Sequence, residues 1–153
     1  VDAGKMIEDK VDCFLCISSG KFYVQGMFMA TEKPVFNLNM EYGKIEPTDQ
    51  LRKKLMKIIA WNRAQFNDAK NVGILVTWKL GQMKLPYIVK EKIEKMGKNA
   101  FILAMDEITP EKLEGLKLDF LVSTGCPRIG IDDISRYKVP IVDSSQLEDL
   151  IDT

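Results

Sequence analysis

One cysteine in a tight turn is the residue of this sequence best suited to chemistry. Cys126 directly follows an apolar run, within Ser123-Thr124-Gly125-Cys126-Pro127-Arg128. Gly125 permits a sharp backbone turn and Pro127 restricts the chain beyond the thiol, so we expect the sulfur to be held at a defined position. Cys-Pro also ends many iron–sulfur ligand runs, and the nearby Arg128 could stabilise a thiolate or bind a carboxylate. Packing as a small apolar side chain is the alternative for this cysteine.

Polar residues also follow two other apolar runs. Trp78-Lys79-Leu80-Gly81-Gln82 comes after residues 71–77, and Gln82 offers both a donor and an acceptor to a polar small molecule. Gly20 and Lys21 come after residues 12–18 and could hold an anion, although the segment matches neither a P-loop nor a G-x-G-x-x-G pattern. Because loops after parallel strands leave the sheet at one edge, we expect Gln82 to lie near Cys126.

Three other short patterns are expected to be structural. Cys13 and Cys16 form a C-x-x-C inside an apolar run, where strand geometry would turn them to opposite faces. We therefore expect two buried small side chains rather than a metal or redox pair. Asp132-Asp133 is interpreted as a solvated helix start rather than a cation site. The basic run Arg52-Lys53-Lys54 indicates a solvated helix face rather than a phosphate-binding track.

Composition narrows the possible chemistry. The 153 residues contain 22 Lys plus Arg, 22 Asp plus Glu and no His. The zero net charge gives no reason to expect a nucleic-acid or membrane partner. Without histidine, the sequence cannot form a Ser-His-Asp triad, a Cys-His dyad or a His-ligated zinc site, which leaves Cys, carboxylates, Lys, Arg, Tyr or a cofactor. Three cysteines, with no signal pattern and no apolar run of membrane length, predict a cytoplasmic protein.

Apolar runs alternate with amphipathic stretches, which predicts an α/β fold of parallel-sheet units with flanking helices. The expected strands are 12–18, 34–39, 71–77, 99–105, 119–123 and 139–142. The clearest helix covers 49–69, where apolar side chains recur at three- and four-residue steps. Further helices are expected from Pro86 to Gly97, at Thr109-Pro110-Glu111, and at the capping box Ser145-Gln146-Leu147-Glu148.

A weak internal repeat divides the chain. Val11-Asp12-Cys13-Phe14-Leu15 resembles Leu118-Asp119-Phe120-Leu121-Val122, and each segment is followed by a Ser/Thr/Gly turn and then by a strand start that contains Lys and Pro. We therefore expect residues 1–45 to be the end of one α/β unit, 46–70 a connecting helix and 71–153 a second unit. The repeat predicts one partial and one complete copy of the same domain.

Residues 118–133, which contain Cys126-Pro127-Arg128, resemble the third-domain signature of the diphthamide synthase iron–sulfur subunit family. Supporting similarities lie at 19–22 with 30–35, at 72–76 with 81–82, and at 105–110, so the resemblance extends in order over nearly the whole chain. The Cys-Pro-Arg signature is the more specific part of it.

The resemblance implies an atypical radical S-adenosylmethionine transferase. Members have three similar α/β domains, each of which gives one cysteine to a central [4Fe-4S] cluster, so Cys126 would be the third metal ligand and two further cysteines would lie outside this segment. The enzyme would transfer a 3-amino-3-carboxypropyl group to a histidine of translation elongation factor 2, the first step of diphthamide biosynthesis. The residues implied to contact S-adenosylmethionine are Arg128, Gln82, Gly20 and Lys21.

The same resemblance implies that 1–45 is the end of the second domain, 46–70 the connecting helix and 71–153 the third domain. We therefore expect the carboxyl-terminal portion of such an enzyme, incomplete as a catalyst by itself. A homodimer is expected because archaeal members form one, with the elongation factor as protein substrate. Two alternatives stay open, a small-ligand-binding α/β module and a non-catalytic scaffold subunit, and Cys126 is structural in both.

Overall fold

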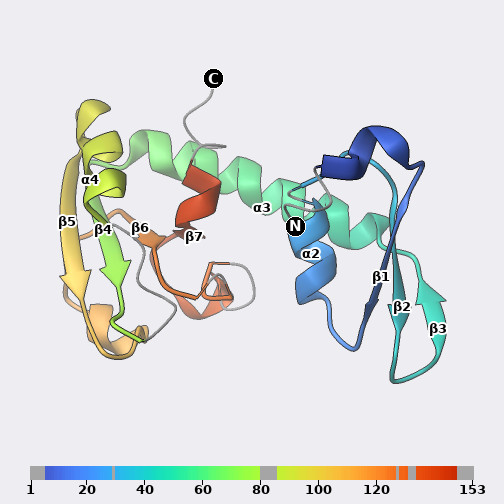
Figure 1. The fold of residues 1–153 in the computed structure, drawn as a ribbon. Coiled ribbons are helices and arrows are strands. Elements are labelled where there is room, and N and C mark those ends of the chain that lie inside the picture. The colour runs from blue at the N-terminus through green and yellow to red at the C-terminus, as the bar shows by residue number, and fades with distance from the viewer. Residues whose placement is uncertain (1–5, 29, 80–85, 127, 131–133, 148–153) are drawn as a thin grey trace. The chain divides into compact units, whose positions relative to one another are not determined.

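The computed structural model describes residues 6–28, 30–79, 86–126, 128–130 and 134–147. Two compact units divide the chain, Val1–Ile59 (unit 1) and Ala60–Thr153 (unit 2). Each unit combines strands with helices, so the expected α/β class is confirmed (Figure 1). The boundary falls inside helix α3 (Asp49–Asp68), the long helix that the apolar spacing predicts.

Unit 1 is built on a three-stranded sheet in the order β1-β2-β3. β1 (Phe14–Ser18) and β2 (Val35–Asn39) run parallel, as expected, and helix α2 (Phe22–Phe28) lies between them in the chain. β3 (Lys44–Glu46) runs antiparallel to β2, so this sheet is mixed rather than purely parallel. A 3-10 turn, η1 (Glu8–Lys10), precedes β1.

Helix α2 and strand β3 are not predicted from the sequence, because neither has a strong local signal. α2 is only seven residues long and contains Gly26, which disfavours helix. Tertiary packing holds it, since Val24 and Phe28 are buried together with Val35 of β2 and Leu55 of α3. β3 has three residues, too few to show the alternation of a strand.

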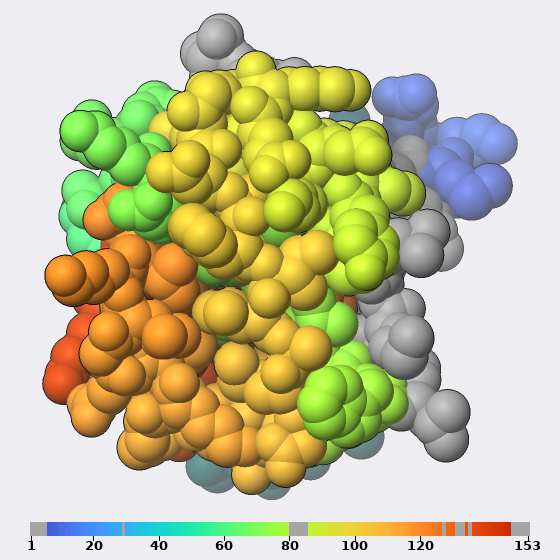
Figure 2. Space-filling view, turned by 90° about the vertical axis from the view of Figure 1, so that its left-hand side faces the viewer, coloured from blue at the N-terminus to red at the C-terminus, as the bar shows by residue number. Residues whose placement is uncertain are grey.

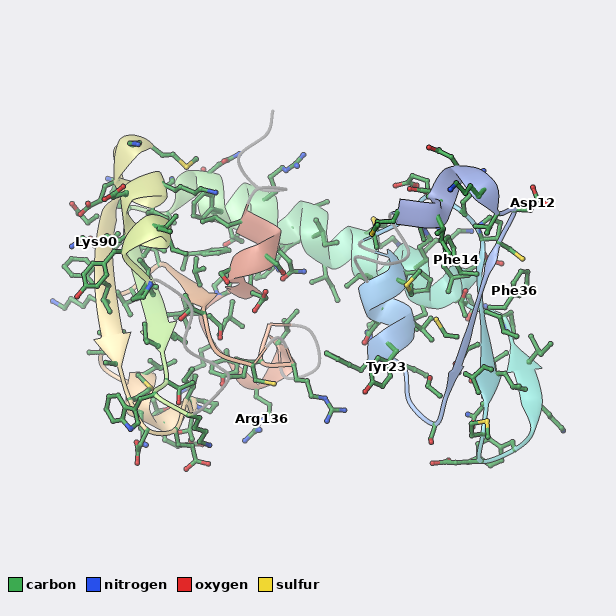
Figure 3. The ribbon with its side chains drawn as sticks, in the orientation of Figure 1. Asp12, Phe14, Tyr23, Phe36, Lys90 and Arg136 are labelled. Carbon is green, nitrogen blue, oxygen red and sulfur yellow. The ribbon has the colours of Figure 1, made fainter. Side chains whose placement is uncertain are left out.

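The sheet of unit 1 buries only one of its faces. Phe14 and Cys16 pack into the core of the unit, whereas Phe36 projects from the opposite face (Figure 3). The side chains of that opposite face are apolar but exposed, and they include Leu15, Ile17, Phe36 and Ile45. β1 pairs with β2 alone, so in the described part of the chain its other edge carries no strand.

Unit 2 contains a four-stranded sheet in the order β5-β4-β6-β7, and every neighbouring pair is parallel. The strands are β4 (Asn71–Val76), β5 (Asn99–Ala104), β6 (Phe120–Ser123) and β7 (Ile141–Asp143), all at or close to their expected bounds. Helix α4 (Pro86–Lys95) lies between β4 and β5 in the chain, and α4 and β5 occupy the middle of the face in Figure 2.

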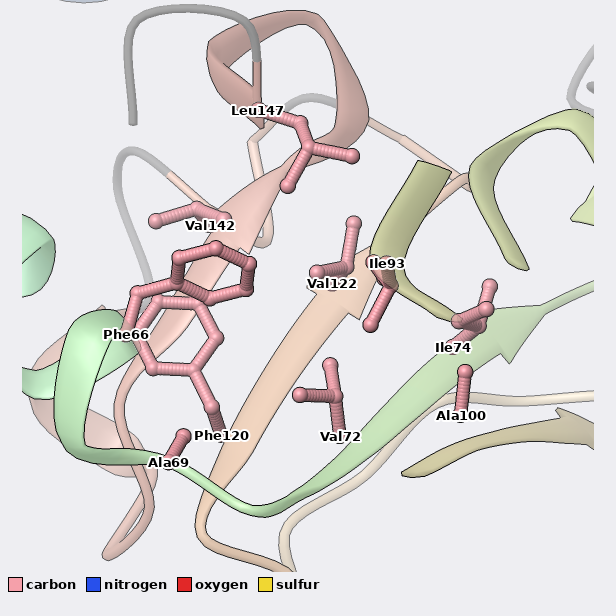
Figure 4. Packing of buried hydrophobic residues seen from close by; sticks show 10 residues of the cluster. All are labelled: Phe66, Ala69, Val72, Ile74, Ile93, Ala100, Phe120, Val122, Val142 and Leu147. Atoms are coloured by element: carbon pink, nitrogen blue, oxygen red, sulfur yellow. The ribbon is translucent and has the colours of Figure 1, made fainter. Parts of the chain in front are cut away.

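The main core of unit 2 packs α3 and α4 against one face of this sheet (Figure 4). Phe66 of α3 and Phe120 of β6 are fully buried, and their rings meet edge to face with centroids 5.1 Å apart. The Lys98 ammonium lies 5.0 Å from the centroid of the Phe66 ring. Leu75 and Leu121 are buried on the other face, so the strands are apolar on both sides, as parallel strands require.

Three 3-10 turns complete the described part of unit 2: η2 (Glu111–Leu113), η3 (Ile134–Arg136) and η4 (Ser144–Gln146). η2 stands where a short helix is expected. A capping box formed by Asp143 and Gln146 opens η4, two residues before the one expected at 145–148, whose Glu148 lies outside the described residues; the Ser145 N–H donates to Asp143 Oδ1 at 2.9 Å. A carboxylate accepts more strongly than a serine hydroxyl, so the turn starts earlier. None of the described helices is both long and apolar enough to cross a membrane.

Truncation of Phe66 tests the packing of this core. Phe66→Ala is expected to lower the free energy of unfolding by about 3–5 kcal/mol, because it leaves a cavity and removes the ring contact with Phe120. Tyr87→Ala removes an aromatic side chain that is 69% exposed on α4, and it should change the stability by only about 0.5 kcal/mol. Denaturant-induced unfolding measures both variants, and equal losses would contradict the packing described.

Candidate functional site

Cys126 lies in the loop that leaves the carboxyl end of β6. Thr124, just before it, is fully buried, and both its backbone N–H and its hydroxyl donate to the Leu75 carbonyl oxygen, at 2.9 and 3.0 Å. After the cysteine, the Ile129 N–H donates to the Cys126 carbonyl oxygen at 3.1 Å and closes a turn. Hydrogen bonds on both sides therefore fix the backbone that carries the thiol.

Gly130 brings the end of the same loop against β7. A Cβ atom at this position would meet the Asp143 backbone nitrogen and would lie 2.7 Å from the Val142 carbonyl carbon. These are backbone atoms of a buried strand, which cannot move aside as a flexible side chain would. Glycine is therefore required for this close approach of the loop to the sheet.

The Cys126 side chain is half-buried and borders a pocket of about 270 Å³ at this edge of the sheet. The pocket wall comes from the loops that follow β4, β5 and β6, together with η3. Apart from Cys126, its residues are Thr77, Lys79, Asp106, Glu107, Ile108, Thr109, Ile129 and Arg136. The thiol is thus next to a hollow whose wall is mostly polar, rather than sealed among aliphatic neighbours.

Charged groups of both signs lie around this pocket. Lys112 Nζ is 2.7 Å from Asp106 Oδ1, and the Glu107 N–H donates to the same oxygen at 2.9 Å. The hydrogen bond from Lys112, followed by that from the Glu107 backbone, holds the pKa of Asp106 below its ordinary value. Lys79 and Arg136 (labelled in Figure 3) add positive charge to the wall. Such a wall could contact both ends of a zwitterionic ligand.

The other predicted site residues are less closely gathered. Arg128 is exposed and is not among the described residues that border the pocket. Gln82 lies outside the described residues. Gly20 and Lys21 belong to unit 1; Gly20 is exposed, and Lys21 borders a separate pocket of that unit.

The C-x-x-C pattern is only partly as expected. Cys16 lies in β1 and packs against the core of unit 1, and burial raises the pKa of its thiol. Cys13 is exposed, so the prediction that it is buried is wrong. The strand begins only at Phe14, so Cys13 lies just before it and is not part of the sheet. Asp132-Asp133 lies outside the described residues.

Three further residues border the pocket and are not among the site residues predicted from the sequence: Thr77, Asp106 and Arg136. Thr77 directly follows β4 and Asp106 comes shortly after β5, so their position after parallel strands is the signal that could have found both. Arg136 has no such signal, because it belongs to η3 and only the tertiary fold brings it to this edge.

Cys126 can provide one soft ligand for a metal centre. Across the residues that the structure describes, no group of three or more Cys, Asp or Glu side chains could hold a metal ion. Iron–sulfur clusters are bound by several thiolates. Cys126 therefore fits as one member of a ligand set that other segments of a protein would complete.

Comparison with known proteins places the chain in a family. The sequence model described as "Putative diphthamide synthesis protein" matches residues 2–152. The chain belongs to this family. The 2-(3-amino-3-carboxypropyl)histidine synthase of Pyrococcus horikoshii is 30% identical over 142 residues, which make up 90% of this chain and 40% of that protein. Subunit 2 of the synthase from Danio rerio is 35% identical over 118 residues, 74% of this chain and 23% of that protein.

A solved structure of the diphthamide synthesis family has the same fold. The crystal structure of Dph2 from Pyrococcus horikoshii with a 4Fe-4S cluster matches this chain with a TM-score of 0.80 and 26% identity. The match covers 92% of this chain and 40% of the Dph2 chain. The chain thus spans less than half the length of each of these relatives.

Replacement of Gly130 tests the close approach of the Cys126 loop to β7. Gly130→Ala is expected to cost about 1–3 kcal/mol of stability, because the added methyl group has no space beside the strand backbone. Gly20→Ala is the control: a Cβ there meets nothing within 4 Å, so the change should stay within about 0.5 kcal/mol. Thermal or urea unfolding measures both, and a neutral Gly130→Ala variant would disprove the contact.

The Asp106–Lys112 pair gives a test based on pH. The lowered pKa of Asp106 means that the pair stabilises the fold above the ordinary value of 3.8, and that this contribution is lost as the pH falls through the lower folded-state value. Lys112→Met should raise the pKa of Asp106 toward 3.8, as measured by NMR titration of its carboxyl group. Lys138→Met removes a lysine that instead pairs with Glu114, and it should leave Asp106 unchanged.

Proposed function

We propose that this chain is part of a transferase that moves the 3-amino-3-carboxypropyl group of S-adenosylmethionine to a histidine of translation elongation factor 2, the first step of diphthamide biosynthesis. The observation that carries the proposal is the position of Cys126 beside a polar pocket, in a chain of the diphthamide synthesis family. The related Dph2 of Pyrococcus horikoshii binds a 4Fe-4S cluster, and thiolates are the usual ligands of such clusters.

In this proposal Cys126 is one ligand of a [4Fe-4S] cluster, and two further cysteines come from outside this chain. The cluster would supply one electron for radical chemistry, as iron–sulfur centres do in other enzymes. The part played by this chain is to hold the thiol in place, through the hydrogen bonds of Thr124 and the close packing of Gly130. The buried strand β6, which directly precedes the loop, anchors it in the core of unit 2.

The residues around Cys126 would also bind S-adenosylmethionine. Lys79 and Arg136 border the same pocket as the thiol, so they could pair with the carboxylate of the substrate. The contacts that the family resemblance implies are Arg128, Gln82, Gly20 and Lys21.

We further propose that the two units are a partial and a complete copy of one domain. Aligning the internal repeat pairs β1 with β6 and β2 with β7. The Phe14 N–H donates to the Pro34 carbonyl oxygen at 2.9 Å, and at the matching place the Leu121 N–H donates to the Pro140 carbonyl oxygen at 2.8 Å. β6 is flanked by β4 on its other side, whereas β1 has no second neighbour in the described part of unit 1, which supports a partial copy.

Elongation factor 2 is the proposed protein partner, with two copies of the complete enzyme forming a homodimer in the cytoplasm. The acceptor histidine would belong to the elongation factor, so a sequence without histidine is compatible with this reaction. No nucleic-acid or membrane partner is proposed.

A non-catalytic scaffold subunit is the second candidate. Cys126 is the one thiol in the described wall of the pocket, and a single thiol does not hold a cluster. In a scaffold subunit this would suffice, because a partner could provide the complete cluster while this chain retained only the fold. Some relatives are named as numbered subunits, which is compatible with such a division of work.

Cluster binding and group transfer test the proposal. In a protein extended to the length of its relatives and reconstituted anaerobically with iron and sulfide, Cys126→Ser should abolish most of the absorbance of the cluster. Transfer of label from carboxyl-labelled S-adenosylmethionine to elongation factor 2 should fall by more than about 100-fold, since changes to groups that merely support metal ligands cost about 10–100-fold.

Cys13→Ser is the matched control, because Cys13 is an exposed thiol of unit 1. It should retain both cluster and transfer. An unchanged cluster in Cys126→Ser would remove this cysteine from the ligand set. A parent protein that binds the cluster but transfers no label would support the scaffold instead.

A further inference from the structure

Unit 1 contains a second polar pocket, of about 530 Å³, which is within the range of small-molecule sites. Its wall includes Lys21, Asn37, Glu46, Gln50 and Lys54. Asn37 lies at the middle of β2 and Lys21 follows the carboxyl end of β1, so the pocket extends from the middle of β2 toward the carboxyl end of β1. The carboxyl ends of parallel strands are where ligands usually bind.

A buried polar network lies beside this pocket, and Asn37 and Glu46 are the members of the network that border it. Asn37 and Asn39 are only 3% and 8% exposed, on the face of β2 that also buries Val35. Asn39 Nδ2 donates to Glu46 Oε1 at 3.1 Å, and Asn37 Nδ2 donates to Glu46 Oε2 at 3.4 Å. These hydrogen bonds satisfy the buried amides, and they hold the Glu46 carboxylate in the wall of the pocket.

Two ammonium groups border the same pocket. The side-chain ammonium groups of Lys21 and Lys54 make no hydrogen bond or ion pair within the part of the chain that the structure describes. The single carboxylate in the wall, Glu46, already accepts two amide hydrogen bonds. The wall therefore carries two unpaired positive charges against one carboxylate that is partly satisfied, which favours an anion.

We propose that this pocket binds a small polar molecule through a phosphate or carboxylate group held between Lys21 and Lys54. Asn37, Glu46 and Gln50 would contact hydroxyl or amino groups on the rest of that molecule. Lys54 belongs to the basic run expected to be a solvated helix face, and its position in the pocket wall gives this one lysine a separate role. The site goes beyond the proposed transferase function, because it includes neither Cys126 nor any residue of its pocket; Lys21, which the family resemblance links to S-adenosylmethionine, is the one residue that the two proposals share.

Titration of the ¹⁵N-labelled chain tests the proposal. Inorganic phosphate and acetate are added separately at constant ionic strength, and the backbone amide shifts of Lys21, Gln50 and Lys54 are followed. At least one anion should produce saturable shifts at these residues. Saturation by phosphate alone would identify a phosphorylated ligand class, saturation by acetate alone a carboxylate class, and saturation by both the shared anion chemistry.

Two substitutions on neighbouring positions of α3 provide the matched comparison. Lys54→Met should lower the affinity for the anion about fivefold or more, roughly the effect of losing one charge-assisted contact. Lys53→Met removes the same charge at an exposed position that does not border the pocket, and should leave the affinity within about twofold. Glu46→Gln keeps the shape of the side chain while removing its negative charge, so it should strengthen the binding.

The amide spectrum of each variant shows whether it is folded before the titration starts. The absence of saturable shifts with both anions in the folded parent chain would overturn the proposal. Equal weakening by Lys53→Met and Lys54→Met would also overturn it, because that result would indicate diffuse surface charge rather than a site.

Discussion

Parallel strand pairing is the constraint on which the candidate site depends. The four strands of unit 2 all run in one direction, so the loops that follow them leave the sheet at the same edge. Thr77, Asp106 and Cys126 are far apart in the sequence, and each comes after a different strand. An antiparallel order would send alternate loops to opposite edges and would separate these residues.

Backbone contacts position the thiol within that edge. The two bonds from Thr124 to Leu75 join β6 to β4 at the point where the chain leaves the sheet, and Gly130 returns it to the backbone of β7. The short loop between them is therefore held at both ends by the sheet itself. This arrangement leaves Cys126 half-buried beside polar groups, with little dependence on the packing of its own side chain.

The sequence predicts those parts of the structure whose signal is local and repeated. The regular apolar spacing of α3 and the apolar runs of β4 and β6 each indicate an element without reference to the rest of the chain. α2 fails this condition, because Val24 and Phe28 are its only buried residues and its helical form depends on the core they join. The pattern around Cys126 likewise predicts the sharp turn after a buried strand.

The residues that line the pocket are harder to predict from the sequence. The turn predicts where Cys126 lies, but it does not predict that Arg136 comes to the same pocket while Arg128, much closer in the chain, is exposed and stays outside its wall. Contacts between distant segments are set by the packing of η3 and the loops, which local spacing does not encode. Asp143 is a second example: it caps η4, although the sequence pattern places the start of the capping box at Ser145.

The uncovered face of unit 1 has a consequence for the behaviour of the chain in solution. Leu15, Ile17, Phe36 and Ile45 are exposed on one side of a sheet whose β1 edge has free backbone hydrogen-bonding groups in the described part of the chain. An apolar surface beside an open strand edge is a template for pairing with another strand. Concentrated solutions of this chain would therefore tend to form oligomers and aggregates unless a further polypeptide segment shields that surface.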